Sequence, residues 1–465
     1  MRRAAVAPLV LLLASCLGRP YQPAPIAAPQ RWQETPAGVV PLPVASSRLP
    51  VSDSTLDALI HDALSDNLDL SAAASRVRES RALRGITAAR GKPQVSTAAS
   101  GLETQRSDAV PPFNSLPPGI SFGDRRQELY DVGFDAGWEL DLFGGIRRDV
   151  EAAVALVQAT DEERRDLQII VMAEVARNYV ELRGAQKRLD VLEARIQTLR
   201  DTVDVVRARH QAGLTNDLDV ARSEALLQET LAGRPSLEFA SVAAMHRLAV
   251  LTGRQPQELV GRLSAHEPLP EVQTEISAGA PLEVIERRPD IRRAEHQLAA
   301  ATARIDVARA DLYPRVSLFG AFGHRSDESS DLLRASSAYW SLGPILRWPL
   351  VTGGRVRAQI DAATARRDQA EAAFQQAILR AMEEVENSLA GYGRDQRERD
   401  RLAAAVAAER RAVDLADSRY RAGLDSFLAV LDVQRTLRDV EDRLAAAETR
   451  VAVSAISLYK SLGGG

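Results

Sequence analysis

Apolar and hydrophilic residues alternate most clearly over residues 130–142. The apolar face comprises Tyr130, Val132, Phe134, Ala136, Trp138, Leu140 and Leu142, and the hydrophilic face Asp131, Gly133, Asp135, Gly137, Glu139 and Asp141. A period of two over this length predicts a β-strand with one apolar side. An acidic, glycine-containing face opposite an aromatic one occurs in soluble sandwiches and in transmembrane barrels. This strand alone leaves both architectures open.

After residue 145 the period changes to that of a helix. Leu182, Ala185, Leu189, Leu192 and Ile196 alternate steps of three and four residues, which predicts a coiled-coil seam. A helix over residues 146–211 would be about 100 Å long at 1.5 Å per residue. Gly213 supplies a turn, and a return helix is expected over 217–252, with a flaw where Gly233 and Pro235 interrupt the pattern.

The chain then repeats this order of elements. The segment that begins with Asp69 and Pro93 recurs with Asp290 and Pro314 at an unchanged spacing, and the turn at Gly213 recurs at Gly423. A steady separation over several motifs indicates an internal duplication. Repeat 1 is expected at 53–253, with helices at 53–67 and 69–90, a β-hairpin at 95–142, the long helix 146–211 and the return helix 217–252. After an irregular linker at 254–280, repeat 2 is expected at 281–465, with a helix at 281–313, a hairpin at 316–350, a long helix at 355–421 and a return helix at 425–462.

Two hairpins give one chain four candidate membrane strands. Four strands cannot close, because even a small barrel needs about eight. In lipid, each unpaired N–H or C=O of an open edge costs several kcal/mol. If the strands span a membrane, hairpins from several copies must combine, and periodicity does not say how many.

The N-terminus predicts export and lipidation. A basic start and a short apolar run over residues 4–13 indicate a signal peptide at 1–15, since this run is shorter than the ~20 residues of a membrane span. The segment Leu13-Ala14-Ser15-Cys16 resembles a bacterial lipobox, which makes Cys16 the lipidated first residue of the mature chain. The alternative is an ordinary signal peptide with an incidental cysteine. Leu17 after the cysteine implies retention in the outer membrane. Residues 16–52, rich in proline and alanine, are expected to form a lipidated N-terminus and extended tether.

Composition excludes several functional classes. The net charge of −4 argues against a nucleic-acid binder. The six histidines show no pair at metal-ligand spacing, and no nucleophile–base pattern occurs. With Cys16 lipidated, no thiol is left for catalysis or a disulfide. We therefore expect a passive α+β membrane protein without cofactor, metal or enzymatic activity.

The motifs, taken in order, resemble the TolC-like outer-membrane efflux channels, in the lipoprotein subgroup that serves resistance–nodulation–division (RND) pumps. The resemblance covers nearly all of the mature chain and rests on the lipobox and on segments 138–144, 287–295, 351–355, 419–424 and 458–464. It implies a homotrimer whose copies share a twelve-stranded barrel, with long antiparallel periplasmic helices forming a tunnel. It also implies docking to a periplasmic adaptor protein that is bound to an inner-membrane RND pump.

Three groups of residues are candidate sites. By resemblance, Leu428 and Asp432, one helical turn apart, would narrow the periplasmic aperture; a core leucine and a solvated aspartate are the alternative. The two helical turns are candidate docking tips for the adaptor, although turn formation alone explains their glycines. These tip residues are Ala212, Gly213, Leu214, Ala422, Gly423 and Leu424. Asp131, Asp135, Glu139 and Asp141 would line the barrel lumen and favour cations, unless other strands dilute their charge.

Other functions stay open at this point. Within the channel interpretation, the chain could serve type I protein secretion or metal-cation efflux instead of drug efflux. A different class is a lipid-anchored periplasmic coiled-coil scaffold whose hairpins pack as soluble β-structure. The sequence does not identify a cargo, because a wide tunnel need not recognise its substrate chemically.

Overall fold

A computed structural model describes residues 21, 26, 28–40, 49–107, 109–111, 124–273, 275–422 and 424–464, with the backbone alone at 421 and 427. The predicted signal peptide, Cys16 and Gly423 lie outside the described residues. The chain divides into two compact units. The first comprises residues 1–23, 78–158 and 295–372, and the second residues 24–77, 159–294 and 373–465.

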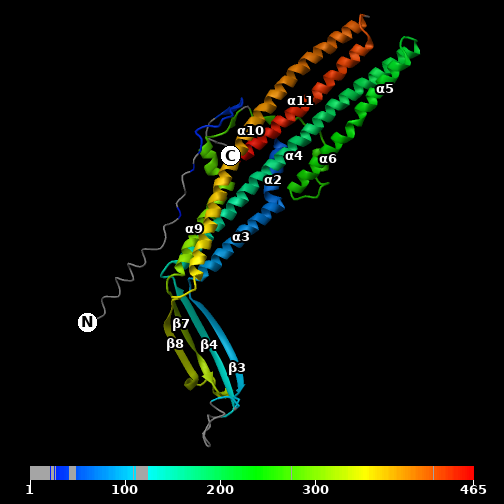
Figure 1. The fold of residues 1–465 in the computed structure, drawn as a ribbon. Coiled ribbons are helices and arrows are strands. Elements are labelled where there is room, and N and C mark those ends of the chain that lie inside the picture. Colours follow the sequence, from blue (N-terminus) through cyan, green and yellow to red (C-terminus); the bar gives the residue numbers. More distant parts are fainter. Residues whose placement is uncertain are drawn as a thin grey trace. The chain divides into compact units, whose positions relative to one another are not determined.

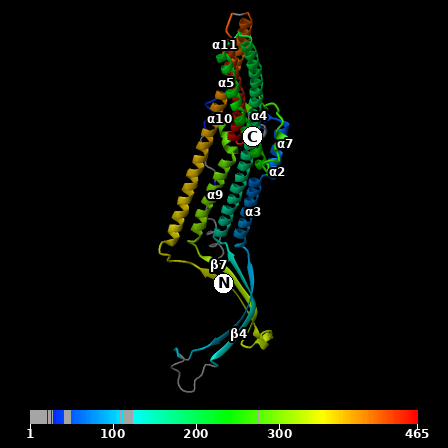
Figure 2. The same cartoon turned by 90° about the vertical axis from the view of Figure 1, so that its right-hand side faces the viewer.

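The strands of the first unit form one four-stranded antiparallel sheet in the order β3-β4-β7-β8 (Figure 1). They are β3 (Gln94–Gln105), β4 (Arg126–Leu140), β7 (Arg315–Ser326) and β8 (Ala338–Arg347), with the short helices η2 (Ser329–Asp331) and η3 (Ala335–Ser337) before β8. Figure 2 shows that the strands bend along their length. The two hairpins of the chain meet where β4 pairs with β7. Within the described ranges, the outer sides of β3 and β8 pair with no further strand.

Helices dominate the rest of the chain. They are α2 (Ser54–Asp66), α3 (Leu68–Ala89), α4 (Gly145–Gln211), α5 (Asp217–Ala232), α6 (Arg234–Leu251), α7 (Val260–Leu263), α8 (Pro281–Arg287), α9 (Pro289–Ala310), α10 (Arg355–Arg421) and α11 (Phe427–Ser461). In the part of the chain that the structure describes, no helix has the apolar length that a membrane crossing requires.

The internal repeat is visible in the lengths of the elements. The helices α3 and α9 have 22 residues each, and the strands β3 and β7 have 12 residues each. The long helices α4 and α10 have 67 residues each. Matched local patterns of turn and seam residues therefore produce matched elements in the two halves.

Each unit has its own core. In the first unit, α4 and α9 approach through small side chains, namely Ala152, Ala155, Ala300 and Ala303. In the second unit, α4 is surrounded by α2, α6 and α11. Its fully buried Tyr179 and Leu182 belong to one cluster with Leu59 of α2, Leu248 of α6 and Ile456 of α11. Burial of this apolar surface is what fixes the helices against one another.

The structure corrects several of the expected helix and strand boundaries. The predicted strand reaches residue 142, whereas β4 ends at Leu140. The predicted return helix 217–252 is divided into α5 and α6 at Gly233, where the sequence predicted a flaw, because Pro235 lacks the N–H that a continuous helix needs. The expected helix 281–313 is also two helices, α8 and α9, since Arg288 before Pro289 takes an extended conformation.

The linker at 254–280 is not wholly irregular. It contains two short strands, β5 (Glu271–Val272) and β6 (Ile276–Ser277). β5 pairs with β2 (Val51–Ser52), and β6 pairs with β1 (Val39–Val40). These partners are too distant in sequence for a local pattern to reveal.

The segment before β1 is fixed to the second unit by specific contacts. Trp32 is buried, and its indole donates a hydrogen bond to the Gly279 carbonyl at 3.1 Å. The carboxylate of Glu386 accepts hydrogen bonds from the backbone N–H groups of residues 33 and 34. A Cβ at Gly393 would lie 2.8 Å from the Pro36 Cβ, so only glycine allows this close approach.

Candidate functional site

The two faces of the sheet differ in chemistry. Phe134, Phe322 and Trp340 lie directly opposite one another on β4, β7 and β8 and form an exposed aromatic row. On the other face, Asp131 lies opposite Arg325 and pairs with it at 2.5 Å, and the Tyr339 hydroxyl donates a hydrogen bond to Asp131 at 3.2 Å. The charge of Asp131 is therefore compensated by a neighbouring strand, which agrees with the alternative that other strands dilute the acidic charge.

Asp141 has a different position from the other three acids. It follows the last residue of β4, and its two carboxylate oxygens accept hydrogen bonds from the N–H groups of Ile146 at 3.1 Å and Arg147 at 2.8 Å. These are unpaired donors of the first turn of α4, where a negative charge is favourable. Asp141 therefore belongs to the strand-to-helix corner. Of the four acids expected to line the lumen, Asp131, Asp135 and Glu139 lie on β4 itself.

Two tryptophans tie the ends of strands to the ends of helices. The Trp138 indole donates to the Gly91 carbonyl at 2.9 Å, just after α3, and the Trp348 indole donates to the Leu312 carbonyl at 3.1 Å, just after α9. The two bonds occupy equivalent places in the two repeats. A tryptophan can satisfy a carbonyl left free at a helix end while its ring stays against apolar surroundings.

The two helical turns have the same construction. The Leu214 N–H donates to the Arg209 carbonyl at 2.8 Å, and the Leu424 N–H donates to the Arg419 carbonyl at 3.0 Å. Gly213 has a φ of +73°, as a left-handed helix end requires. Leu214 and Leu424 are 68% and 67% exposed, so both turns present an apolar side chain to solvent. Ala212 lies exposed beside Leu214.

A side-chain contact with an aspartate stabilises each turn. The His210 ring lies 2.9 Å from the Asp217 carboxylate, across the first turn. The Arg419 guanidinium lies 2.6 Å from the Asp425 carboxylate, across the second. Hydrogen bonding to Arg419 lowers the pKa of Asp425 below its usual range. The turns are thus held by specific contacts even though they are exposed.

Leu428 and Asp432 lie in the first two turns of α11, where Leu428 is 43% exposed and Asp432 follows it by four residues. This separation places them on one helix face. Close to the same turn, Arg209 of α4 donates a hydrogen bond to the Tyr420 hydroxyl of α10, and its guanidinium lies 5.3 Å from the centre of the tyrosine ring. This contact joins the two helical hairpins, and no sequence pattern indicated it.

A buried arginine anchors the other end of α11. Arg288 donates to the Ser461 carbonyl and to the carboxylates of Asp290 at 2.8 Å and Glu384 at 2.7 Å. Burial by itself would lower the pKa of Arg288, but the hydrogen bonds to Asp290 and Glu384 outweigh it and raise the pKa. Arg287 donates to the Leu462 carbonyl. Arg287 and Arg288, which belong to one of the segments that carry the sequence resemblance, therefore fix the C-terminal end of α11.

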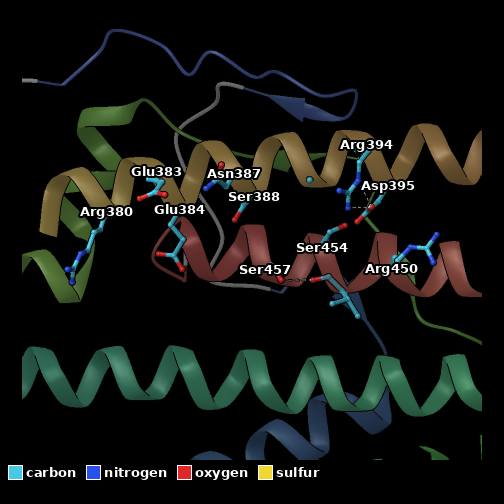
Figure 3. Close-up of a pocket in the computed structure, with 12 residues that line it drawn as sticks. Arg380, Glu383, Glu384, Asn387, Ser388, Arg394, Asp395, Arg450, Ser454 and Ser457 are labelled. Carbon is cyan, nitrogen blue, oxygen red and sulfur yellow. Dashed lines mark hydrogen bonds and ion pairs between the residues drawn. The ribbon is translucent and has the colours of Figure 1, made fainter. Parts of the chain in front are cut away.

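A polar groove of about 650 Å³ runs between α10 and α11 (Figure 3). Arg380, Glu383, Asn387 and Arg394 line it from α10, and Arg450 and Ser454 from α11. Among the residues that the structure describes, no group of three or more His, Cys, Asp or Glu side chains is arranged to hold a metal ion.

Comparison with known proteins identifies this architecture. A family model described as "Outer membrane efflux protein" matches residues 59–254 and 280–464. The solvent efflux pump outer membrane protein SrpC of Pseudomonas putida is 32% identical over 415 residues, covering 89% of this chain and 86% of that protein. Nodulation protein T of Rhizobium leguminosarum bv. viciae is 30% identical over 471 residues, covering 100% and 93%.

The solved structure of the outer-membrane channel OprN is similar throughout, with a TM-score of 0.82, 35% identity, and coverage of 95% of this chain and 99% of that chain. The resemblance inferred from sequence is thereby confirmed. The chain belongs to the outer membrane efflux protein family and has the fold of the TolC-like outer-membrane channels.

Proposed function

We propose that this protein is the outer-membrane exit duct of a tripartite efflux system. An inner-membrane RND pump delivers drugs or other small molecules, and a periplasmic adaptor joins the pump to the helical turns. The pairing of the sheet is the observation that carries the proposal. Four strands leave β3 and β8 with open edges, which lipid does not tolerate, so copies of the chain must complete the wall.

The number of copies is inferred from the family to which the chain belongs and not from the geometry of the single chain. Members of this family assemble three copies, so we propose a homotrimer with a twelve-stranded barrel. The exposed aromatic row of Phe134, Phe322 and Trp340 supports a lipid-facing side. Asp131, Asp135 and Glu139, on the opposite side, face the lumen in this arrangement. Cys16, which lies outside the described residues, carries the lipid anchor in the outer membrane.

The duct itself performs no chemistry, and the pump supplies the energy. Leu428 and Asp432 form its narrow periplasmic aperture, and the exposed Leu214 and Leu424, with Ala212, Gly213, Ala422 and Gly423, form the adaptor tips. The apolar exposure at both turns supports a docking role, because such side chains are covered when a partner binds.

Two measurements test this function. In a host that lacks its own outer-membrane duct but keeps a related pump and adaptor, expression of the chain should restore efflux of a fluorescent dye and raise drug tolerance. In planar bilayers, the purified protein should conduct ions. A soluble monomer without conductance after replacement of Cys16 would instead support the scaffold alternative.

A further inference from the structure

A second groove, also of about 650 Å³, lies between α4, α11 and the junction of α5 with α6. Part of its lining is apolar and half-buried, namely Val191, Leu192 and Leu237. Five arginines and three acids line it as well. The groove therefore combines apolar surface with an excess of positive charge.

Two of these arginines hold the helices together. Arg188 donates hydrogen bonds to both carboxylate oxygens of Asp442, at 2.7 and 3.0 Å, and Arg195 donates to Asp439 at 3.3 Å. These pairs join α4 to α11 and neutralise two of the three acids. The remaining acid of the lining is Glu229, on α5.

Two other arginines of the lining have no such role. Arg435 and Arg443 are exposed, and among the residues that the structure describes neither side chain has a hydrogen bond or an ion pair. Arg438, between them in sequence, donates instead to Glu441 at 3.0 Å. At 1.5 Å per residue, Arg435 and Arg443 are separated by about 12 Å along the helix axis. Each end of the groove therefore carries a guanidinium group that can accept a negatively charged partner.

The groove lies where the two repeats differ. Gly233 and Pro235 separate α5 from α6 in repeat 1. Since α5 begins at residue 217 and α11 at residue 427, the equivalents in repeat 2 are Arg443 and Ala445, which lie inside the unbroken α11. A Cβ at Gly233 would meet only the Thr230 carbonyl oxygen, at 3.5 Å. The interruption of the return helix thus leaves open space beside α4 in repeat 1.

The groove opens on the face of α11 that carries the proposed aperture. Leu428 and Asp432 lie on this face, and steps of three and four residues lead from Asp432 through Arg435 and Asp439 to Arg443. The opposite face of α11 is covered, because it packs in the core cluster that includes Trp32. If Leu428 and Asp432 narrow the lumen, the groove faces the lumen too.

We propose that this groove is a site in the duct wall for amphipathic organic anions. Arg435 and Arg443 bind the carboxylate or sulfonate group, because a guanidinium presents several donors in one plane and stays charged at every physiological pH. Val191, Leu192 and Leu237 contact the apolar part of the same molecule. This inference rests on the proposed function and deepens it, since it names a chemical class of cargo that the wall contacts.

Binding of the fluorescent dye anilinonaphthalene sulfonate tests the site. The full chain, reconstituted as oligomers in lipid nanodiscs, is titrated with the dye, and the signal of empty nanodiscs is subtracted. Arg435→Gln and Arg443→Gln should each weaken binding about tenfold or more, as the loss of a hydrogen bond to a charged group does. Phenylnaphthylamine, which lacks only the sulfonate, should bind equally to the natural chain and to both variants.

Two further variants separate the groove from general effects of charge. Arg450→Gln removes an arginine of α11 that lies outside this groove and pairs with Glu398 at 2.6 Å, so it should leave dye binding unchanged. Gly233→Leu fills part of the groove without a change of charge, and the φ of −76° at this position suits any residue. Both dyes should then bind more weakly.

The outcomes distinguish this inference from the function on which it rests. Weaker sulfonate binding in the groove variants, but not in Arg450→Gln, supports the site. Equal sulfonate binding by the natural chain and the groove variants overturns it, and the duct stands if the same oligomers conduct ions. If the groove variants bind the sulfonate more weakly but the natural chain neither conducts nor restores dye efflux, the duct function falls, and the role of the groove in transport falls with it.

Discussion

Arg209 and Tyr420, at the ends of α4 and α10, are joined by a hydrogen bond and by stacking of the guanidinium at 5.3 Å from the ring centre. This is a direct bond between the two helical hairpins, next to both exposed turns. A contact in this place holds the two turns together, and its loss would let them separate.

We expect Tyr420→Phe and Arg209→Ala to loosen the contact between the hairpins and to raise single-channel conductance in planar bilayers. Arg209→Ala should have the larger effect, because it also removes the cation–π contact. Such a contact is worth about 0.5–1 kcal/mol at an exposed site. Arg207→Ala is the matched control, since Arg207 pairs with Glu224 inside the first hairpin. Equal conductance in all three variants would show that the contact does not restrain the turns.

The proposed aperture gives a second prediction. Leu428→Ser and Asp432→Ala should each raise conductance, because both remove side-chain bulk or fixed charge from the narrowest part of the duct. Leu218→Ser is the control, as Leu218 occupies the equivalent place in repeat 1 and is also exposed. If Leu218→Ser raises conductance more than Leu428→Ser does, the aperture has been assigned to the wrong hairpin.

Ion selectivity should depend on the partner of Asp131. The variant Arg325→Ala leaves this carboxylate without its cationic partner and should therefore increase the preference for cations. The increase should be at most roughly fivefold, since a charge a few ångströms from an ion contributes about 1 kcal/mol in water. Asp135→Asn should shift the preference in the opposite direction. Reversal potentials in a salt gradient measure both. No shift in either variant would place this face outside the ion path.

Stability should depend strongly on Arg288. Its side chain is 8% exposed, so Arg288→Ala leaves Asp290 and Glu384 without their buried partner and should cost roughly 3–5 kcal/mol. Arg292→Ala, four residues later, should cost at most about 1 kcal/mol, because Arg292 is 43% exposed and lies 3.6 Å from Glu162. Chemical denaturation in detergent compares the two, and similar losses would contradict the role assigned to Arg288.

Alkaline pH should weaken the core of the second unit through Tyr179. Burial raises the pKa of Tyr179 to about 12, opposed by Arg183 and assisted by the hydrogen bond to Asp53. The unfolded chain loses this proton near pH 10 and the folded chain near 12, so the folded state binds more protons between these values. The contribution of the Tyr179 proton to the stability of the folded state is therefore fully present below pH 10 and is lost as pH rises towards 12.

Melting temperatures measured from pH 9 to 12 should fall more steeply for the natural chain than for Tyr179→Phe, which has no proton to lose at this position. The phenylalanine variant will be less stable at neutral pH, because the hydrogen bond to Asp53 at 2.8 Å is missing. The slope of the melting temperature against pH, rather than the melting temperature itself, is the informative quantity. Parallel slopes would show that Tyr179 does not titrate in this range.

The elements with strong local periodicity were predictable. The predicted long helices begin and end within one residue of α4 and α10, because an uninterrupted apolar seam and a turn glycine fix a helix without reference to the rest of the fold. The family and the fold class are confirmed by the comparisons. The assignments of aperture, docking tips and lumen stay predictions, since a single helix face carries no signature of what it lines.

Other features depended on contacts that a local pattern does not contain. Asp141 fits the alternation of a strand and also the start of a helix, and only the position of Ile146 decides between them. The contact of Arg209 with Tyr420 joins residues from the two halves of the chain. The register of Gly184 against Thr449 depends on how two long helices pack, which seam periodicity leaves undetermined.

The equal lengths of α4 and α10 restrict where insertions and deletions can occur in such a chain. The segment from the start of β3 at residue 94 to α4 at 145 is longer than the segment from β7 at 315 to α10 at 355. The difference in length between the aligned halves thus lies in the hairpins and the corners after them. An insertion or deletion in one long helix would displace its turn from the other by about 1.5 Å per residue, and would separate Arg209 from Tyr420. Variation in length is therefore accommodated at the strand hairpins, while a change in the long helices must occur in both halves at once.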